Sequence, residues 1–298
     1  MKPATARALH LGASLYVPAT RAKLAAVLSG REIPALRSVI ACTEDAVADG
    51  ELEGALSNLA AVLQALDPAE WRPDLLRFVR VRNPAVMARV LAMPGVEKLH
   101  GFVLPKFTLD VLPQYQAQLK GRNFWLMPTL ETAEVFNQDA MRELSLALAS
   151  NEWKSRILAL RVGGSDLLRL LGLRRTRGMT LYDTPLGSLL SQLVLTFKPL
   201  GFALTAPVFD FIEDEHVLAQ EARRDVAFGF CGKTAIHPAQ IATIEAAFHV
   251  SASELIAARR LMEPDCPAVF KHDGTMYEAV VHRDWARQVI AKREMLAM

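Results

Sequence analysis

Short apolar runs alternate with segments of helical spacing along most of the chain. The segments between the runs place apolar residues three and four positions apart, as Leu52, Leu56 and Leu59 show, which is the spacing of an amphipathic helix. About eight such units indicate a parallel sheet and predict an α/β fold closed into a (β/α)8 TIM barrel. The apolar runs lie at residues 11–19, 36–45, 75–83, 99–106, 122–131, 156–166, 201–210 and 227–238.

The segment after the eighth run has a different pattern. Residues 240–262 have the spacing of one or two helices, residues 263–284 contain Pro and Gly and predict a loop or hairpin, and residues 284–296 predict a final helix. We therefore expect a catalytic barrel over residues 1–245 and a C-terminal extension over 246–298 that serves as a lid or an oligomer contact. An open doubly wound sheet is the second choice, because no G-x-G-x-x-G follows the first strand.

Composition excludes several classes of protein. The chain has 298 residues, a net charge of +2 and no long basic run, so nucleic acid is not an expected partner. No uninterrupted apolar run approaches the roughly 20 residues that span a bilayer, and we expect no membrane partner. The three cysteines are widely spaced, which favours neither a disulfide framework nor a zinc site and indicates a reducing cytoplasm.

Polar residues recur where the predicted strands end, which is where barrel enzymes carry their chemistry. Glu131 and Asp166 end successive strands, and two carboxylates suit Mg²⁺, which fills its other positions with water and substrate oxygens. Arg80 could hold a substrate carboxylate in a bidentate fork. This combination suits a 2-oxo acid. The other polar residues at strand ends are Glu44, Asp45, Arg82, Lys106, Lys233 and His237.

Each of these residues also has a purely structural interpretation. Glu44 with Asp45, Glu131, and Asp166 with Ser165 could each cap the helix that follows. Lys106 follows Pro105 and could lie on a surface loop. Arg80 and Arg82 alternate with valines, so they are expected to share one face of their strand.

Seven stretches spread along the chain give it a family resemblance. They are SLYVPATR (14–21), TEDAV (43–47), VRVRN (79–83), GFVLPK (101–106), PTLETA (128–133), LRVGGSDL (160–167) and GFCGKTAIHPAQI (229–241). With these motifs the chain resembles the citrate lyase β-subunit-like branch of the HpcH/HpaI aldolase superfamily, which includes malyl-CoA and citramalyl-CoA lyases. The resemblance implies a TIM barrel that binds Mg²⁺ through Glu131 and Asp166, with Arg80 on the oxo-acid carboxylate.

The resemblance also implies a reaction and its residues. A β-hydroxyacyl-CoA would be cleaved into a 2-oxo acid and an acyl-CoA. Glu44 or Glu278 would serve as acid or base, and Lys106 and Gly164 would contact the substrate. Glu278 stands where related lyases carry an aspartate, often offered to a neighbouring subunit, and a homotrimer or hexamer is expected.

Some features of the chain leave other functions open. The second strand reads Cys42-Thr43-Glu44-Asp45, with one acidic residue fewer than the family pattern, and Arg82 is a second choice for the carboxylate site. The basic segment Arg174–Arg177 could meet CoA phosphates. The alternatives are an aldolase or lyase that acts on a free or carrier-bound acid, and a non-catalytic barrel that serves as an assembly subunit.

Overall fold

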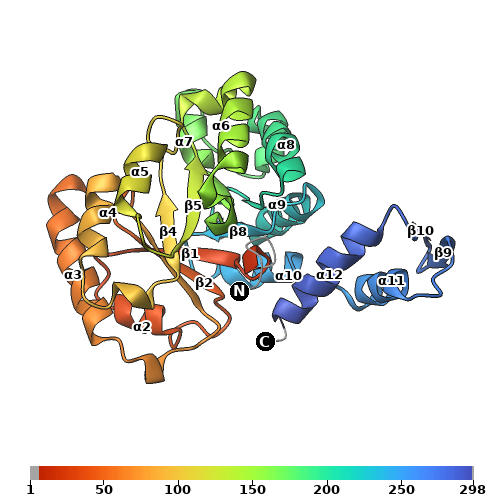
Figure 1. The fold of residues 1–298 in the computed structure, drawn as a ribbon, viewed down its shortest axis with the longest axis horizontal. Coiled ribbons are helices and arrows are strands. Elements are labelled where there is room, and N and C mark those ends of the chain that lie inside the picture. Colours follow the sequence, from red (N-terminus) through yellow and green to blue (C-terminus); the bar gives the residue numbers. More distant parts are fainter. Residues whose placement is uncertain (1–6, 297–298) are drawn as a thin grey trace.

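Eight parallel strands form a nearly closed barrel in this computed structural model, which describes residues 7–296 (Figure 1). Consecutive strands pair from β1 to β7, β1 also pairs with β8, and a parallel bridge between Ala206 and Lys233 joins β7 to β8. The predicted (β/α)8 barrel is confirmed, and the open doubly wound sheet is wrong. The strands are β1 (Gly12–Pro18), β2 (Ser38–Cys42), β3 (Leu76–Arg80), β4 (Gly101–Leu104), β5 (Trp125–Leu130), β6 (Leu160–Val162), β7 (Leu204–Thr205) and β8 (Gly232–Ala235).

Helices lie between successive strands and surround the barrel (Figure 1). Their starts are encoded locally: the Asn83 side chain accepts a hydrogen bond from the Val86 amide, with Pro84 in the first turn, and Asn137 caps a later helix in the same way. The helices are α2 (Leu24–Ser29), α3 (Leu52–Ala65), α4 (Pro84–Leu91), α5 (Leu112–Gln118), α6 (Gln138–Ser150), α7 (Gly164–Leu170), α8 (Leu186–Phe197), α9 (Glu215–Ala227) and α10 (Gln240–Ala247).

The barrel interior carries a polar level. Thr129, Arg161 and Thr205 are register partners on β5, β6 and β7, and all three are buried. The interior of such a barrel is usually filled by branched apolar side chains. Polar groups buried at this level need partners, and two of them, Thr129 and Arg161, line the cavity described below.

The C-terminal extension forms an arm with its own small core (Figure 1). Helix α11 (Ala252–Met262), the antiparallel hairpin β9 (Val269–His272) and β10 (Thr275–Glu278), and α12 (Arg283–Leu296) make up the arm. Residues 1–6 of the predicted barrel domain and residues 297–298 of the predicted extension lie outside the described residues. The buried members of the small core are Val250, Ala258, Leu261, Ala279, Ala286 and Val289.

One segment, Gln240–Met262, is apolar and long enough to cross a membrane by length and composition, and 33% of its most apolar window is buried. Length and composition alone are weak evidence, because helices of soluble proteins pass the same test. The segment is divided between α10 and α11, and Ser251, in extended backbone, caps α11. Helix α10 packs against β1 and α9, and α11 packs against α12, so both have partners within the chain.

Candidate active site

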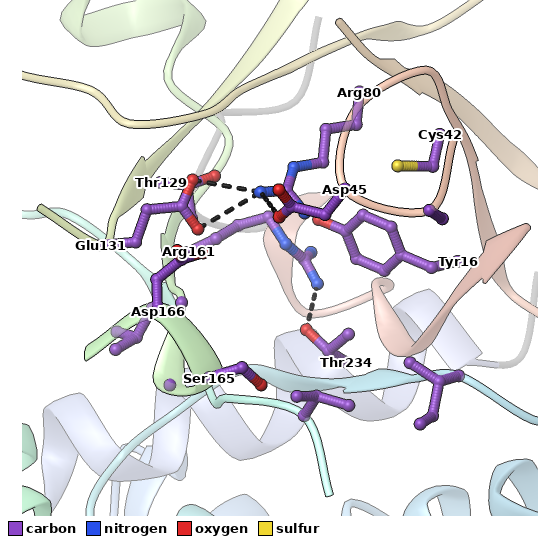
Figure 2. Close-up of a pocket in the computed structure, with 16 residues that line it drawn as sticks. Tyr16, Cys42, Asp45, Arg80, Thr129, Glu131, Arg161, Ser165, Asp166 and Thr234 are labelled. Atoms are coloured by element: carbon purple, nitrogen blue, oxygen red, sulfur yellow. Dashed lines mark hydrogen bonds and ion pairs between the residues drawn. The ribbon is translucent and has the colours of Figure 1, made fainter. Parts of the chain in front are cut away.

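A cavity of about 300 Å³ lies at the carboxyl-terminal ends of the strands (Figure 2). Tyr16, Arg80 and Arg161 reach it from within β1, β3 and β6. Glu131 directly follows β5, and Asp166 lies in the first turn of α7, just after β6. The structure thus brings together the predicted metal ligands and the predicted carboxylate-binding arginine.

Arg80 is the centre of an ion cluster in this cavity (Figure 2). Its Nη2 lies 2.6 Å from Glu44 Oε2, 3.0 Å from Asp45 Oδ2 and 3.1 Å from Glu131 Oε1. Burial lowers the pKa of Arg80, but Tyr16 and the neighbouring carboxylates outweigh burial and raise it, so the guanidinium stays charged. Its Nε is buried without a partner among the described residues.

Glu131 is almost fully buried, with 3% of its surface exposed. Its carboxylate accepts hydrogen bonds from Arg80 and from the Lys106 amide, the latter at 2.8 Å. Burial raises the pKa of Glu131 to about 7 against the opposing charge of Arg80. A Cβ atom at Gly163 would overlap the Glu131 side chain, so a glycine is required there for the carboxylate to occupy its place.

Asp166 does not act as a helix cap. No side-chain hydrogen bond caps α7, and Asp166 Oδ1 instead accepts one from Arg169 Nη2 at 3.0 Å. The Asp166 carboxylate lines the cavity, and its charge contributes to the raised pKa of Glu131. The two carboxylates therefore interact electrostatically within the cavity.

Asp45, rather than its neighbour Glu44, lines the cavity. Glu44 is 5% exposed and lies against Arg80 and the Lys106 ammonium. Burial raises the pKa of Glu44. For Asp45, hydrogen bonding with Glu44 and the charges of Arg80 and Lys106 outweigh burial and lower the pKa. Glu44 is the member of this pair predicted from the sequence as an acid or base, and in the structure it lies against Arg80 and Lys106 and supports them.

Two other basic residues differ from their expected positions. The Lys106 ammonium contacts Glu44 and Asp45, and its residue has a left-handed backbone (φ 47) that directs the amide at Glu131. Lys106 is absent from the cavity lining. Arg82 lies beyond the end of β3, does not share the inward face of Arg80, and donates to Thr43 O at 3.3 Å and to Asp49. It therefore holds the loop after β2 and does not line the cavity.

Three further predicted positions have distinct environments. Gly164 lines the cavity, where an added Cβ would meet Pro207 at 2.8 Å. Glu278 lies on hairpin strand β10, in the arm and away from the cavity of its own chain (Figure 1). Within the basic segment, Arg175 is buried against Glu221, so only Arg174 and Arg177 of its three arginines are exposed.

Lys233 was expected at a strand end but is the second residue of β8, and it belongs to a second buried ion cluster outside the barrel. Its ammonium donates to Glu221 Oε1 and Asp225 Oδ2 on α9, both at 2.8 Å. Arg175 Nη1 lies 2.7 Å from Glu221, and the Tyr182 hydroxyl donates to Asp225 at 2.7 Å. These contacts attach the segment after α7 to α9.

Tyr16 and Arg161 are cavity residues for which the sequence predicted no role. The Tyr16 ring lies close to two arginine side chains, with Arg80 Cζ 5.7 Å and Arg161 Cζ 5.3 Å from its ring centre. The available signal for Arg161 was a single cation within the apolar run of β6.

The donor set fits a hard divalent cation that retains open positions. Among residues 7–296, no group of three or more His, Cys, Asp or Glu side chains could hold a metal ion. Glu131 and Asp166 thus offer two carboxylates, which is the number that Mg²⁺ commonly takes from a protein. A cation would also offset the burial that raises the pKa of Glu131.

Acidic and basic side chains gathered at the strand ends of a barrel are typical of a TIM-barrel enzyme. Comparison with known proteins shows which family of such enzymes the chain belongs to. The chain belongs to the family of carbon–carbon bond lyases of the TIM-barrel fold, whose model matches residues 5–297. The expected relation to the citrate lyase β-like branch and the expected carbon–carbon lyase class are confirmed.

Individual relatives are similar over most of their length. A (3S)-malyl-CoA thioesterase of Cereibacter sphaeroides is 27% identical over 303 residues, with 95% of this chain and 94% of that protein covered. The mitochondrial citramalyl-CoA lyase of Rattus norvegicus is 27% identical, with 89% and 81% covered. The solved structure of CitE from Mycobacterium tuberculosis, in complex with magnesium, acetoacetate and coenzyme A, has a TM-score of 0.69 and 22% identity, with 96% and 99% covered.

Proposed function

We propose that the protein is a Mg²⁺-dependent lyase that cleaves a β-hydroxyacyl-CoA of the malyl-CoA or citramalyl-CoA type into a 2-oxo acid and an acyl-CoA. The observation that carries this proposal is the convergence of Glu131, Asp166 and Arg80 on one cavity. The printed names of the relatives support the substrate class, since two of them act on malyl-CoA and citramalyl-CoA. The complex of CitE with magnesium and coenzyme A supports both the metal and the thioester.

Glu131 and Asp166 would hold the metal. When bound there, Mg²⁺ would supply Lewis-acid stabilisation of the negative charge that develops on the substrate oxygens. The Lys106 amide and Gly163 keep Glu131 in position, the first by a hydrogen bond and the second by leaving room. Arg80, which lines the cavity, would bind the carboxylate of the 2-oxo acid portion.

Asp45 is our candidate for the proton acceptor. It lines the cavity, and its lowered pKa keeps it ionised at neutral pH. Asp45 would remove the proton of the substrate hydroxyl, the oxygen would become the carbonyl of the 2-oxo acid, and the bond to the carbon next to the thioester would break. The electron pair of the broken bond would form the enolate of the acyl-CoA, and this enolate must then be protonated at carbon. Glu44 would position Arg80 and Lys106.

Glu278 can take part only if a second copy of the chain supplies it. In one chain it lies on the arm, away from the cavity (Figure 1). Residues next to it are apolar and exposed: Val280 by 88%, Val281 by 69% and Met276 by 58%. Exposed apolar groups gathered along one short segment are typical of an interface. We therefore propose a homo-oligomer in which the arm contacts a neighbouring barrel and Glu278 protonates the enolate.

The test is Mg²⁺-dependent cleavage of malyl-CoA and citramalyl-CoA, with 2-oxo acid and free thiol measured in parallel. Wild type should release glyoxylate or pyruvate without free thiol, because the thioester survives C–C cleavage. Asp166→Ala should reduce the rate by at least about 100-fold because a metal ligand is lost. Asp166→Ala and Glu278→Gln chains, inactive separately, should regain activity when refolded together if neighbouring chains share the site.

Each other outcome assigns a different function. Free thiol with intact malate would indicate thioester hydrolysis, and turnover that needs no metal would overturn the proposed role of Glu131 and Asp166. If neither thioester reacts although Mg²⁺ binds, the substrate is a free or carrier-bound acid. If neither thioester reacts and Mg²⁺ does not bind, the barrel is non-catalytic.

A further inference from the structure

A second cavity, of about 500 Å³, lies at the amino-terminal end of the barrel, where the C-terminal arm meets it. Phe202 and Ala203 directly precede β7, Phe230 and Cys231 directly precede β8, and all four line this cavity together with residues of α12. The candidate active site lies at the opposite end of the strands, and the two cavities have no lining residue in common. The volume of the second cavity falls within the range of about 300–1,000 Å³ that is typical of small-molecule sites.

Two half-buried lysines, Lys198 and Lys292, line this second cavity. Neither ammonium forms an ion pair with a carboxylate among residues 7–296. Lys198 Nζ donates to Gly229 O at 2.6 Å, and Lys292 Nζ lies 5.2 Å from the centre of the Phe248 ring. Burial lowers the pKa of both lysines. Since burial disfavours their charged form, an anion placed beside them would stabilise it.

Both lysines lie near one buried atom of the cavity wall, the sulfur of Cys231. Burial raises the pKa of the Cys231 thiol to about 11, and the charges of Lys198 and Lys292 both act against that rise. Gly229 makes room for one of these charges, because it has a left-handed backbone (φ 86) and an added Cβ would lie 2.5 Å from Lys198 Nζ. The two ammonium groups therefore belong to the same part of the cavity.

The rest of the lining is mainly apolar and adds little negative charge. Arg287 lines the cavity and pairs with Asp284 at 2.6 Å. The lining contains a single carboxylate, that of Glu254, which accepts hydrogen bonds from the Ser251 amide and hydroxyl at the start of α11. The larger apolar side chains come from both the barrel and the arm, and they include Phe202, Phe230, Val250 and Trp285.

We propose that this cavity binds an organic anion with an apolar body, such as a medium-chain or aryl carboxylate or sulfonate. The acidic group would accept hydrogen bonds from the ammonium groups of Lys198 and Lys292, and the apolar body would lie against the aromatic residues of the lining. Such a ligand would contact the barrel and α12 together and would hold the arm against the barrel. The inference does not depend on the proposed function, because the active-site cavity lies at the other end of the barrel.

The test compares two fluorescent probes that share an apolar body and differ in charge. 8-Anilinonaphthalene-1-sulfonate carries a sulfonate, and N-phenyl-1-naphthylamine has no charged group. Dissociation constants are measured by fluorescence titration of the full chain, as wild type, Lys198→Met, Lys292→Met and the double variant. Lys98→Met is the matched control, because the Lys98 ammonium also donates to backbone carbonyls, those of Leu63 and Leu66, but does not line the cavity.

Wild type and Lys98→Met should prefer the sulfonate by roughly 10- to 100-fold, as expected for hydrogen bonds to charged groups. Each single variant should lose part of this preference and the double variant most of it, while all chains bind the neutral probe alike. Octanoate should displace the sulfonate, and octan-1-ol should not. Trp285→Phe should reduce energy transfer from tryptophan to the bound sulfonate, because Trp285 lines the cavity.

Equal affinity of wild type for the two probes would overturn the inference. A preference that survives in the double variant would also overturn it, since the sulfonate would then bind elsewhere. If the double variant does not fold, Trp285→Phe decides, and unchanged energy transfer would exclude this cavity. If wild type binds neither probe and the double variant loses an oligomer that wild type forms, a second copy of the chain occupies the cavity in place of a small anion. Each of these results leaves the lyase proposal intact.

Discussion

Two buried ion clusters of this molecule use the same residue types to different ends. The cluster around Lys233 is closed: its ammonium is shared by Glu221 and Asp225, and each acid has a further donor. The cluster around Arg80 opens into the cavity, and Arg80 Nε has no partner among the described residues. In this molecule the incomplete network lies at the candidate binding site, whereas the complete one holds elements together.

One buried glutamate from each cluster, Glu221 and Glu131, has a pKa that moves in the opposite direction to the other. Lys233 and Arg175 outweigh burial and lower the pKa of Glu221 to about 2, so its carboxylate is fully compensated. Burial outweighs the charge of Arg80 and raises the pKa of Glu131 to about 7, so the positive charge near this carboxylate does not offset its burial. The closed cluster should therefore govern stability, and the open cluster should govern binding.

The largest expected effect on stability is at the centre of the closed cluster. Lys233→Met leaves Glu221 and Asp225 buried with fewer donors, and the free energy of unfolding should fall by about 3–5 kcal/mol in urea titrations. Arg224→Met is the matched control: it removes a half-exposed pair with Asp183 from the rim of the same region and should cost less than about 1 kcal/mol. Equal losses in the two variants would show that the closed cluster is not the structural centre.

Acid should weaken the closed cluster through Glu221. The folded-state pKa is about 2 and the ordinary value is 4.5, so the unfolded chain binds the proton first as pH falls. The stabilisation, about 3 kcal/mol, is fully present above pH 4.5 and is lost as pH falls toward 2. The difference in unfolding free energy between wild type and Glu221→Gln should shrink over that interval. A difference that stays constant from pH 7 to pH 3 would contradict this assignment.

The smallest effect concerns two unpaired hydroxyls at the polar level of the barrel. The Oγ1 atoms of Thr129 and Thr205 are both buried without partners, but only Thr129 lines the cavity. Replacing either residue by Val removes an unsatisfied group, so each variant should gain up to about 1 kcal/mol in thermal unfolding. Thr129→Val should also weaken 2-oxo acid binding several-fold, and Thr205→Val should not. Equal affinity in the two variants would exclude the Thr129 hydroxyl from the site.

Much of the fold could be predicted from the sequence because its signals are local. Each predicted strand contains a strand of the barrel, and the Pro- and Gly-containing tail forms the hairpin of β9 and β10. The exact ends of the strands could not be predicted, because apolar residues continue past the hydrogen-bonded ladder. For example, β7 spans two residues within a predicted run of ten. Apolar character reports burial, whereas a strand also requires an aligned neighbour.

The site could be predicted only in part, because the sequence does not fix the direction in which every side chain points. Glu131 and Asp166 follow buried strands, and any carboxylate there must face the same end of the barrel. Glu44 and Asp45 are adjacent, so only the backbone of their loop decides which one lines the cavity. The face of Arg161 depends on how β6 is oriented in the closed barrel, and the partners of Lys233 come from α9, a separate element.

The close packing of Gly163 against Glu131 has a consequence for how this chain can change over generations. While the carboxylate is present, every side chain at position 163 collides with it, so substitutions there should be rejected. Once Glu131 is replaced by a smaller residue, the collision disappears and position 163 is free to vary. The two positions should therefore drift together in alignments of related chains, and a glycine lost at 163 should identify descendants that have given up the carboxylate.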